Sequence, residues 1–234
     1  MRAPRQLELR FAARGGRRAG AGRPRKAGAG ISHLRRPSLS RHHPLHVTLR
    51  VRRGISSLRE HAVFASIRRA LHAGKDRFGF ALIQFSVQRD HLHLIAEARD
   101  RRALSRGLQG LSIRVARAVN GRLHREGKVF ADRYHARALK TPRAVRLALR
   151  YVLLNARKHA SSVPAGFIDR CSSAPWFTGF TRPIELAFGA RAARAEWERT
   201  SGSSDPPVML PHSWLLRAGQ LRAGPFDVDE IPGG

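Results

Sequence analysis

Apolar residues that alternate with polar ones predict four β-strands in the middle of the chain. The first spans His46–Arg52, where every second residue is Val or Leu and would face a core. Apolar runs over 80–87 and around His91–Ile95 predict two more strands, and the tight polar turn 88–90 between them predicts a hairpin. A fourth strand is expected over 128–139.

Apolar residues at three- and four-residue spacing predict three helices. The first follows a cap at Ser56 or Ser57 and ends at Gly74, the second spans about 101–124, and the third spans about 141–159. Threonine at the cap and proline at the first helical position favour the start of the third. The order β-α-β-β-α-β-α predicts an α+β fold, the ferredoxin-like antiparallel sheet with one added helix.

The flanks of this domain differ from it in composition. Residues 1–43 are rich in glycine and cations and predict a flexible basic arm, and the domain itself spans 44–160. Residues 161–234 predict an irregular extension with a short helix around 186–199 and with Trp214–Leu216 docked on the body. For the acidic end, 226–230, we favour a frayed terminus over the alternative, a shield for a basic groove.

Positive charge dominates the composition. The chain of 234 residues has 45 Lys and Arg against 16 Asp and Glu, a net charge of +29, and such an excess favours a polyanionic partner, usually nucleic acid. The single cysteine, Cys171, excludes an intramolecular disulfide and argues against a cysteine metal cluster. No apolar run approaches the ~18 residues of a membrane span. With no secretory leader visible, we expect no membrane contact and a cytoplasmic, nucleoid-associated protein.

Candidate DNA-binding cations lie in four parts of the chain. The arm carries Gly22-Arg23-Pro24-Arg25, which resembles an AT-hook for the minor groove, although a basic tail without sequence preference is the favoured interpretation. The second helix has a basic outer face, and the fourth strand and third helix add further cations. The predicted DNA contacts are Arg23, Arg25, Lys26, Arg114, Arg117, Arg133, Arg137, Arg157 and Lys158.

Two histidines separated by one leucine mark the candidate chemistry. In a strand, His91 and His93 project from one face while Leu92 faces the core, and two such imidazoles can hold a divalent metal. The sheet face without the crossing helices would be free for such a site. Taken alone, His-x-His is more often an ordinary strand than a metal site.

The third helix adds a second group of polar residues. Asn155 lies one turn after Tyr151 and shares its face, and Lys158 follows about one turn later. The other tyrosine, Tyr134, has the parity of Phe130 and is expected in the core. A phenol, an amide and a cation beside a metal pair suit phosphodiester cleavage, in which the phenolate attacks phosphorus.

These motifs resemble the HUH single-strand nucleases with one catalytic tyrosine, and more closely the bacterial REP-associated tyrosine transposases. The resemblance covers residues 42–160 and rests on His91-Leu92-His93 followed by a helix with Tyr151-x-x-x-Asn155. It implies His91 and His93 as metal ligands and Tyr151 as the nucleophile that forms a 5′-phosphotyrosine. It also implies that Asn155 completes the metal shell or contacts DNA, that Mg²⁺ or Mn²⁺ is the cofactor, and that hairpin-forming single-stranded DNA is the substrate. Both a homodimer and a monomer are compatible with it.

The sequence departs from the family in two places. Ala156-Arg157-Lys158-His159 follows Asn155 where the family commonly has Pro-Val-Arg-Ala-Gly, and Asp90 precedes the first histidine where asparagine or glutamate is frequent. Neither change removes a catalytic atom.

Two other functions remain open at this point. A domesticated, non-cleaving protein that binds DNA hairpins would use the same charge and the same arm. A two-histidine phosphodiesterase would use His46-Val47-Thr48-Leu49 together with His91-Leu92-His93-Leu94, although His93 stands where that chemistry requires Ser or Thr.

Overall fold

The computed structural model describes residues 39–159, 163–187 and 189–232. All of these residues belong to one compact unit, Ile31–Gly234. The arm residues for which we predict DNA contacts, Arg23, Arg25 and Lys26, lie outside the described residues.

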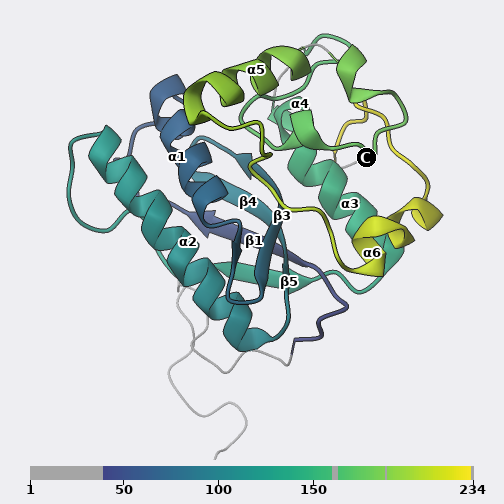
Figure 1. Ribbon diagram of the computed structural model, residues 1–234, viewed down its shortest axis with the longest axis horizontal. Coiled ribbons are helices and arrows are strands. Elements are labelled where there is room, and N and C mark those ends of the chain that lie inside the picture. Colours follow the sequence, from purple (N-terminus) through teal and green to yellow (C-terminus); the bar gives the residue numbers. More distant parts are fainter. Residues whose placement is uncertain (1–38, 160–162, 188, 233–234) are drawn as a thin grey trace, which may run out of the picture. The chain divides into compact units, whose positions relative to one another are not determined.

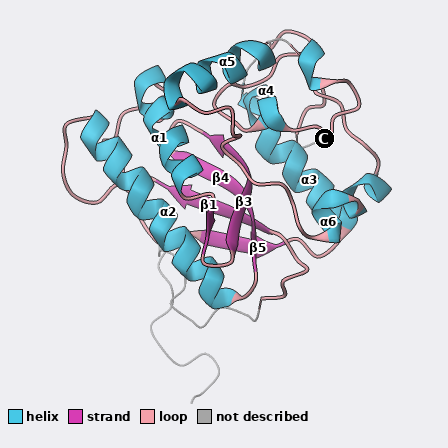
Figure 2. Cartoon of the chain, in the orientation of Figure 1, coloured by secondary structure: helices cyan, strands magenta, loops and turns pink. Residues whose placement is uncertain are grey.

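An antiparallel five-stranded sheet is the centre of this unit (Figures 1 and 2). Its spatial order is β2-β3-β4-β1-β5. The strands are β1 (Leu45–Arg50), β2 (Asp76–Arg77), β3 (Phe80–Val87), β4 (His91–Ala98) and β5 (His135–Ala138). The helices are α1 (His61–Ala73), α2 (Arg101–Arg122), α3 (Pro142–Leu153), α4 (Asn155–His159), α5 (Ala190–Ser201) and α6 (Trp214–Arg217). Short 3₁₀ helices are η1 (Ala174–Trp176), η2 (Ile184–Leu186) and η3 (Gly219–Ala223). The α+β class and the predicted order of strands and helices are confirmed.

Two hydrophobic clusters cover the two faces of the sheet. On one face, Val47, Leu92 and Leu94 pack with residues of α1 and α2. On the other face, Ile83 and Ile95 pack with α3 and with the C-terminal extension. Among the strands, helix α3 contacts mainly β3 and β4. The neighbouring face of β1 and β5 therefore keeps half-buried and exposed polar side chains, and the candidate site lies there.

Side-chain caps fix the starts of α2 and α3. Asp100 accepts a hydrogen bond from the Ala103 N–H at 2.7 Å, and Thr141 accepts one from the Ala144 N–H at 3.1 Å, with Pro142 at the first helical position. Because this cap fixes where α3 begins, it also fixes where Tyr151 stands in its last turn.

The first helix starts later than predicted. Ser57 Oγ accepts a hydrogen bond from the Arg59 N–H at 3.3 Å and closes a turn, while the Leu58 N–H donates to the Arg89 carbonyl. The serine cap is thus used in a turn before the helix, and α1 begins at His61. The predicted end at Gly74 is confirmed.

The fourth predicted strand is shorter than expected. Phe130 forms only an isolated bridge with Val51, and regular pairing resumes at β5. Between them the Asp132 carboxylate accepts a hydrogen bond from the Arg133 N–H at 2.7 Å. This local contact takes a backbone donor that a continuous strand would need.

The C-terminal extension is more ordered than predicted. Helix α5 confirms the expected short helix. Its Trp197 is 1% exposed, and the Cζ atom of Arg68 on α1 lies over the Trp197 ring, 5.2 Å from the ring centroid. The buried Glu97 carboxylate of β4 accepts backbone hydrogen bonds from His212 and Ser213, both at 2.8 Å. Leu215 and Leu216 are buried, which confirms that this segment docks on the body.

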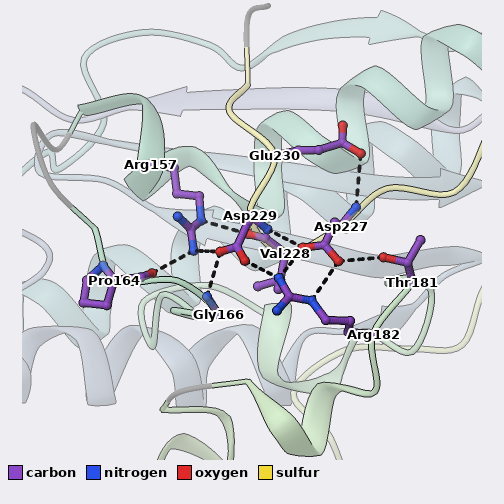
Figure 3. A network of polar contacts seen from close by, with 9 residues as sticks. All are labelled: Arg157, Pro164, Gly166, Thr181, Arg182, Asp227, Val228, Asp229 and Glu230. Carbon is purple, nitrogen blue, oxygen red and sulfur yellow. Dashed lines mark hydrogen bonds and ion pairs between the residues drawn. The ribbon is translucent and has the colours of Figure 1, made fainter.

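The acidic end is docked, so our favoured interpretation of a frayed terminus is wrong. Figure 3 shows Asp227 and Asp229 between Arg157 and Arg182. The hydrogen bond from Arg182 lowers the pKa of Asp227, which keeps this carboxylate ionised at neutral pH. Glu230 pairs with Arg146 at 2.9 Å and with Arg150 at 3.0 Å on α3. Within the described residues, no helix is long and apolar enough to cross a membrane.

Candidate active site

Strand register brings five polar side chains of β1 and β4 to the part of the sheet face that α3 leaves uncovered, which we call the open face. Thr48 pairs with His93 and Arg50 pairs with His91 in the antiparallel ladder. Directly paired residues project from the same side of a sheet, and His46 lies two residues before Thr48 on that side. The face therefore holds two histidines from β4 and one from β1.

The two β4 histidines are spaced as ligands of one metal ion would be. The Nε2 atoms of His91 and His93 lie 3.0 Å apart. Two nitrogen ligands at right angles, each about 2.1 Å from an octahedral ion, would also stand about 3.0 Å apart. The residues fit a divalent ion, since they supply two ligands and leave its other positions open. Across the described residues there is no cluster of three or more His, Cys, Asp or Glu side chains that could enclose a metal.

His91 is oriented by its neighbour in sequence. The Asp90 carboxylate lies 2.7 Å from Nδ1 of His91, so this nitrogen carries the proton and Nε2 is left for the metal. The hydrogen bond with His91, supported by Arg50, lowers the pKa of Asp90 and keeps it ionised. The departure at position 90 thus preserves an acceptor for the histidine ring.

His93 is oriented from β1. Its Nδ1 lies 3.2 Å from Nε2 of His46 and 3.3 Å from Oγ1 of Thr48. When Nε2 of His93 is a metal ligand, Nδ1 carries the proton and donates it to one of these two acceptors. His93 is 6% exposed, so its ring has little freedom to turn.

His46 is held in its neutral form. Burial, together with the charges of His135 and Arg137, lowers the pKa of His46 from 6.5 to about 4. At neutral pH its ring therefore has one nitrogen without a proton, which is what an acceptor for His93 requires.

Tyr151 reaches the histidine cluster from α3. Its hydroxyl lies 3.4 Å from Nε2 of His93, and its ring centroid lies 4.9 Å from that of His93 and 5.8 Å from that of His46. The phenol oxygen thus borders the position that a metal on His91 and His93 would take. Tyr134, the other tyrosine, is half-buried and packs against the core on the α1 and α2 side, consistent with the prediction.

Asn155 is a buried amide whose hydrogen-bonding groups are not used within the described structure. It begins α4 immediately after the last turn of α3, and it is 1% exposed. Neither its amide oxygen nor its amide nitrogen has a hydrogen-bond partner among the described residues. Such a buried amide costs stability, and this cost suggests that a ligand supplies the missing partner.

The predicted DNA-contacting residues fall into separate groups. Arg133 and Arg137 are exposed at or beside β5, on the edge of the site, and Arg137 pairs in register with His46. Arg114 and Arg117 lie on α2, which covers the opposite face of the sheet. They are therefore not part of the same surface as Tyr151. The side chain of Lys158 lies outside the described part.

Arg157 has a structural role in place of the predicted DNA contact. Its guanidinium donates to the carbonyls of Val228 at 2.8 Å and Pro164 at 3.0 Å, and it pairs with Asp229 (Figure 3). The side chain is 9% exposed. These contacts leave it little surface for a phosphate.

His46 and Thr48 are the members of the site that sequence reasoning did not assign to it. Their alternation on the first strand was visible, but it was read only as half of a two-histidine motif. The register of β1 against β4 was needed to place them beside His93.

Comparisons with known proteins give one family. Residues 40–153 match the family model described as "Transposase IS200 like". A solved REP-associated tyrosine transposase bound to a REP hairpin is 18% identical, with a TM-score of 0.46, over 56% of this chain and 76% of that one. A candidate transposase of Deinococcus radiodurans R1 is 17% identical, with a TM-score of 0.36, over 50% of this chain and 87% of that one. No curated protein matches this chain.

Proposed function

We propose that this chain, whose residues 40–153 match the model of the IS200-like transposase family, is a metal-dependent nuclease and strand transferase that cleaves single-stranded DNA through Tyr151. One observation carries the proposal. The Tyr151 hydroxyl, from α3, lies 3.4 Å from the nitrogen with which His93 would bind a metal, beside the matching nitrogen of His91. A nucleophile and a two-histidine pair thus meet on the open face of the sheet.

The side chains divide the work as follows. His91 and His93 would hold a Mg²⁺ or Mn²⁺ ion, with Asn155 as the candidate third ligand. Such an ion would supply polarisation of the scissile phosphate and offset the charge that develops on it. The Tyr151 oxygen attacks phosphorus, so that a phosphotyrosine bond forms on the 5′ side while the bond to the 3′ oxygen breaks and leaves a free 3′-hydroxyl. Attack by another 3′-hydroxyl on the phosphotyrosine would reverse this step and join strands.

Hairpin-forming single-stranded DNA is the proposed substrate. Cleavage requires an unpaired strand that can place one phosphate between Tyr151 and the histidines. The exposed Arg133 and Arg137 at the edge of the site are the candidate contacts to the neighbouring phosphates. Such a protein would act on chromosomal DNA in the nucleoid.

The two tyrosines of the chain provide the test. Labelled single-stranded hairpin DNA is incubated with the protein and Mg²⁺ or Mn²⁺, and covalent adducts are separated on a denaturing gel. We expect an adduct with the wild-type protein and with Tyr134→Phe, and none with Tyr151→Phe or with EDTA. Tight DNA binding without any adduct in the wild-type protein would contradict cleavage and indicate a non-cleaving hairpin-binding protein.

A two-histidine phosphodiesterase is the second candidate, because His46 and Thr48 of β1 do face His93 of β4. Against it, His46 and His93 contact each other directly, whereas an acid and a base must flank the substrate from two sides. This function would give cleavage that survives EDTA and Tyr151→Phe and that never yields an adduct.

A further inference from the structure

A basic groove lies between α3 and the C-terminal extension. It encloses about 570 Å³, and its walls come from Thr141–Arg150 on one side and from Arg222 and Ala223 of η3 on the other. Four arginines line it: Arg143, Arg146, Arg150 and Arg222. Among its lining residues in the described part of the chain, none is acidic.

Glu230 from the acidic end pairs with Arg146 and Arg150. Among the described residues, the four guanidinium groups of the groove and this one carboxylate sum to a formal charge of +3. A groove of this sign attracts and concentrates anions.

Two of the guanidinium groups, those of Arg222 and Arg146, are held in place. Arg222 stacks over the ring of Trp214 with its carbon 5.0 Å from the ring centroid, and Trp214 itself packs closely against Gly219. Arg146 donates to the Gly224 carbonyl at 2.6 Å and to the Pro225 carbonyl at 2.9 Å. Arginines fixed by such contacts lose less side-chain entropy when a phosphate binds.

The groove wall includes the turn of α3 that precedes Tyr151. Leu147 in the groove wall lies one turn before Tyr151 along the helix. With a rise of 1.5 Å per residue, Arg143 lies about 12 Å along the helix from Tyr151. A strand in the groove would therefore lie against the same helix that carries the proposed nucleophile.

We propose that the groove between α3 and η3 binds the phosphates of the single-stranded DNA that flanks the cleavage point. This inference rests on the proposed function for the identity of the ligand. It gives the C-terminal extension a part in substrate binding, since Arg222 belongs to that extension.

The test measures binding without cleavage. In a Tyr151→Phe background, Arg143→Gln and Arg222→Gln together remove two exposed cations of the groove. The matched control, Arg191→Gln with Arg199→Gln, removes two exposed cations of α5. Affinity for a fluorescent single-stranded oligonucleotide is followed by anisotropy between about 50 and 200 mM salt. Unfolding curves followed by circular dichroism verify that both variants are folded.

We expect the groove variant to lose about 1.4 from the slope of log affinity against log salt, because each single-strand phosphate contributes about 0.7. The control should lose much less. Equal slopes in the two variants would overturn the groove assignment. A wild-type protein that forms no adduct would overturn the proposed function instead, because this binding comparison does not depend on cleavage.

Discussion

At the scale of single residues, His93 contacts four other members of the site. Its Nε2 faces His91 and Tyr151, and its Nδ1 faces His46 and Thr48. The acceptors for a proton on Nδ1 thus come from β1, a strand 45 residues earlier in the chain. The metal pair of β4 depends on β1 for its orientation.

Removing both acceptors should weaken metal binding. His46→Ala with Thr48→Val leaves Nδ1 of His93 without a partner, and loss of such supporting contacts typically lowers metal affinity about 10- to 100-fold. Mn²⁺ binding followed by electron paramagnetic resonance measures the change without any cleavage assay. His46→Gln, which retains an acceptor, should restore much of the affinity, and His61→Ala at the start of α1 is the exposed control. Unchanged Mn²⁺ affinity in the double variant would exclude this orienting role.

Replacing Asn155 by an apolar residue should stabilise the fold and weaken metal binding. Because its buried amide has no hydrogen-bond partner in the described structure, Asn155→Leu should raise the free energy of unfolding by about 1–3 kcal/mol and weaken Mn²⁺ binding. Asn120→Leu is the matched control with the opposite expected sign, since the Asn120 amide donates to the Gly127 carbonyl and accepts from Arg125. Urea denaturation measures both variants. A destabilised Asn155→Leu protein with unchanged Mn²⁺ binding would indicate a purely structural asparagine.

At the scale of elements, the acidic end depends on ionised carboxylates. Arg182 lowers the pKa of Asp227 below its ordinary value of 3.8, so docking is fully stabilised above that pH and weakens as the pH falls further. The thermal midpoint of the wild-type protein should exceed that of Asp227→Asn at pH 6, and the difference should shrink as the pH falls below about 4. Asp76→Asn, at an exposed position of β2, is the control. A difference in thermal midpoint that stays constant as the pH falls from about 6 to about 2.5 would contradict the role of Asp227.

Local sequence signals predicted some elements better than others. Apolar runs gave the bounds of β3 and the start of β4, which continues past the predicted Ile95 to Ala98, and Thr141-Pro142 marked the start of α3. The fourth strand failed because a single side chain, Asp132, competes for the backbone, and periodicity does not register such a contact. Ser57 failed as a helix cap for a similar reason, since the same hydroxyl can close a turn.

At the scale of the whole molecule, the features that sequence reasoning missed depend on contacts between residues far apart in the chain. His91, His93, Tyr151 and Asn155 were identified from local spacing and resemblance, but the place of His46 required the register between β1 and β4. Arg157 was expected to face DNA, and it pairs with Asp229, 72 residues later. The structure also turns the C-terminal extension from an irregular tail into one wall of the basic groove.

The most direct measurement of the central claim locates the DNA on the protein. Trypsin, which cuts after Lys and Arg, places Tyr151 in the peptide 151–157 and Tyr134 in the peptide 134–137. After reaction with hairpin DNA and nuclease trimming, mass spectrometry of the peptides should find a nucleotide phosphate on 151–157 alone. A nucleotide on the Tyr134 peptide, or cleaved DNA with no modified peptide, would contradict Tyr151 as the nucleophile.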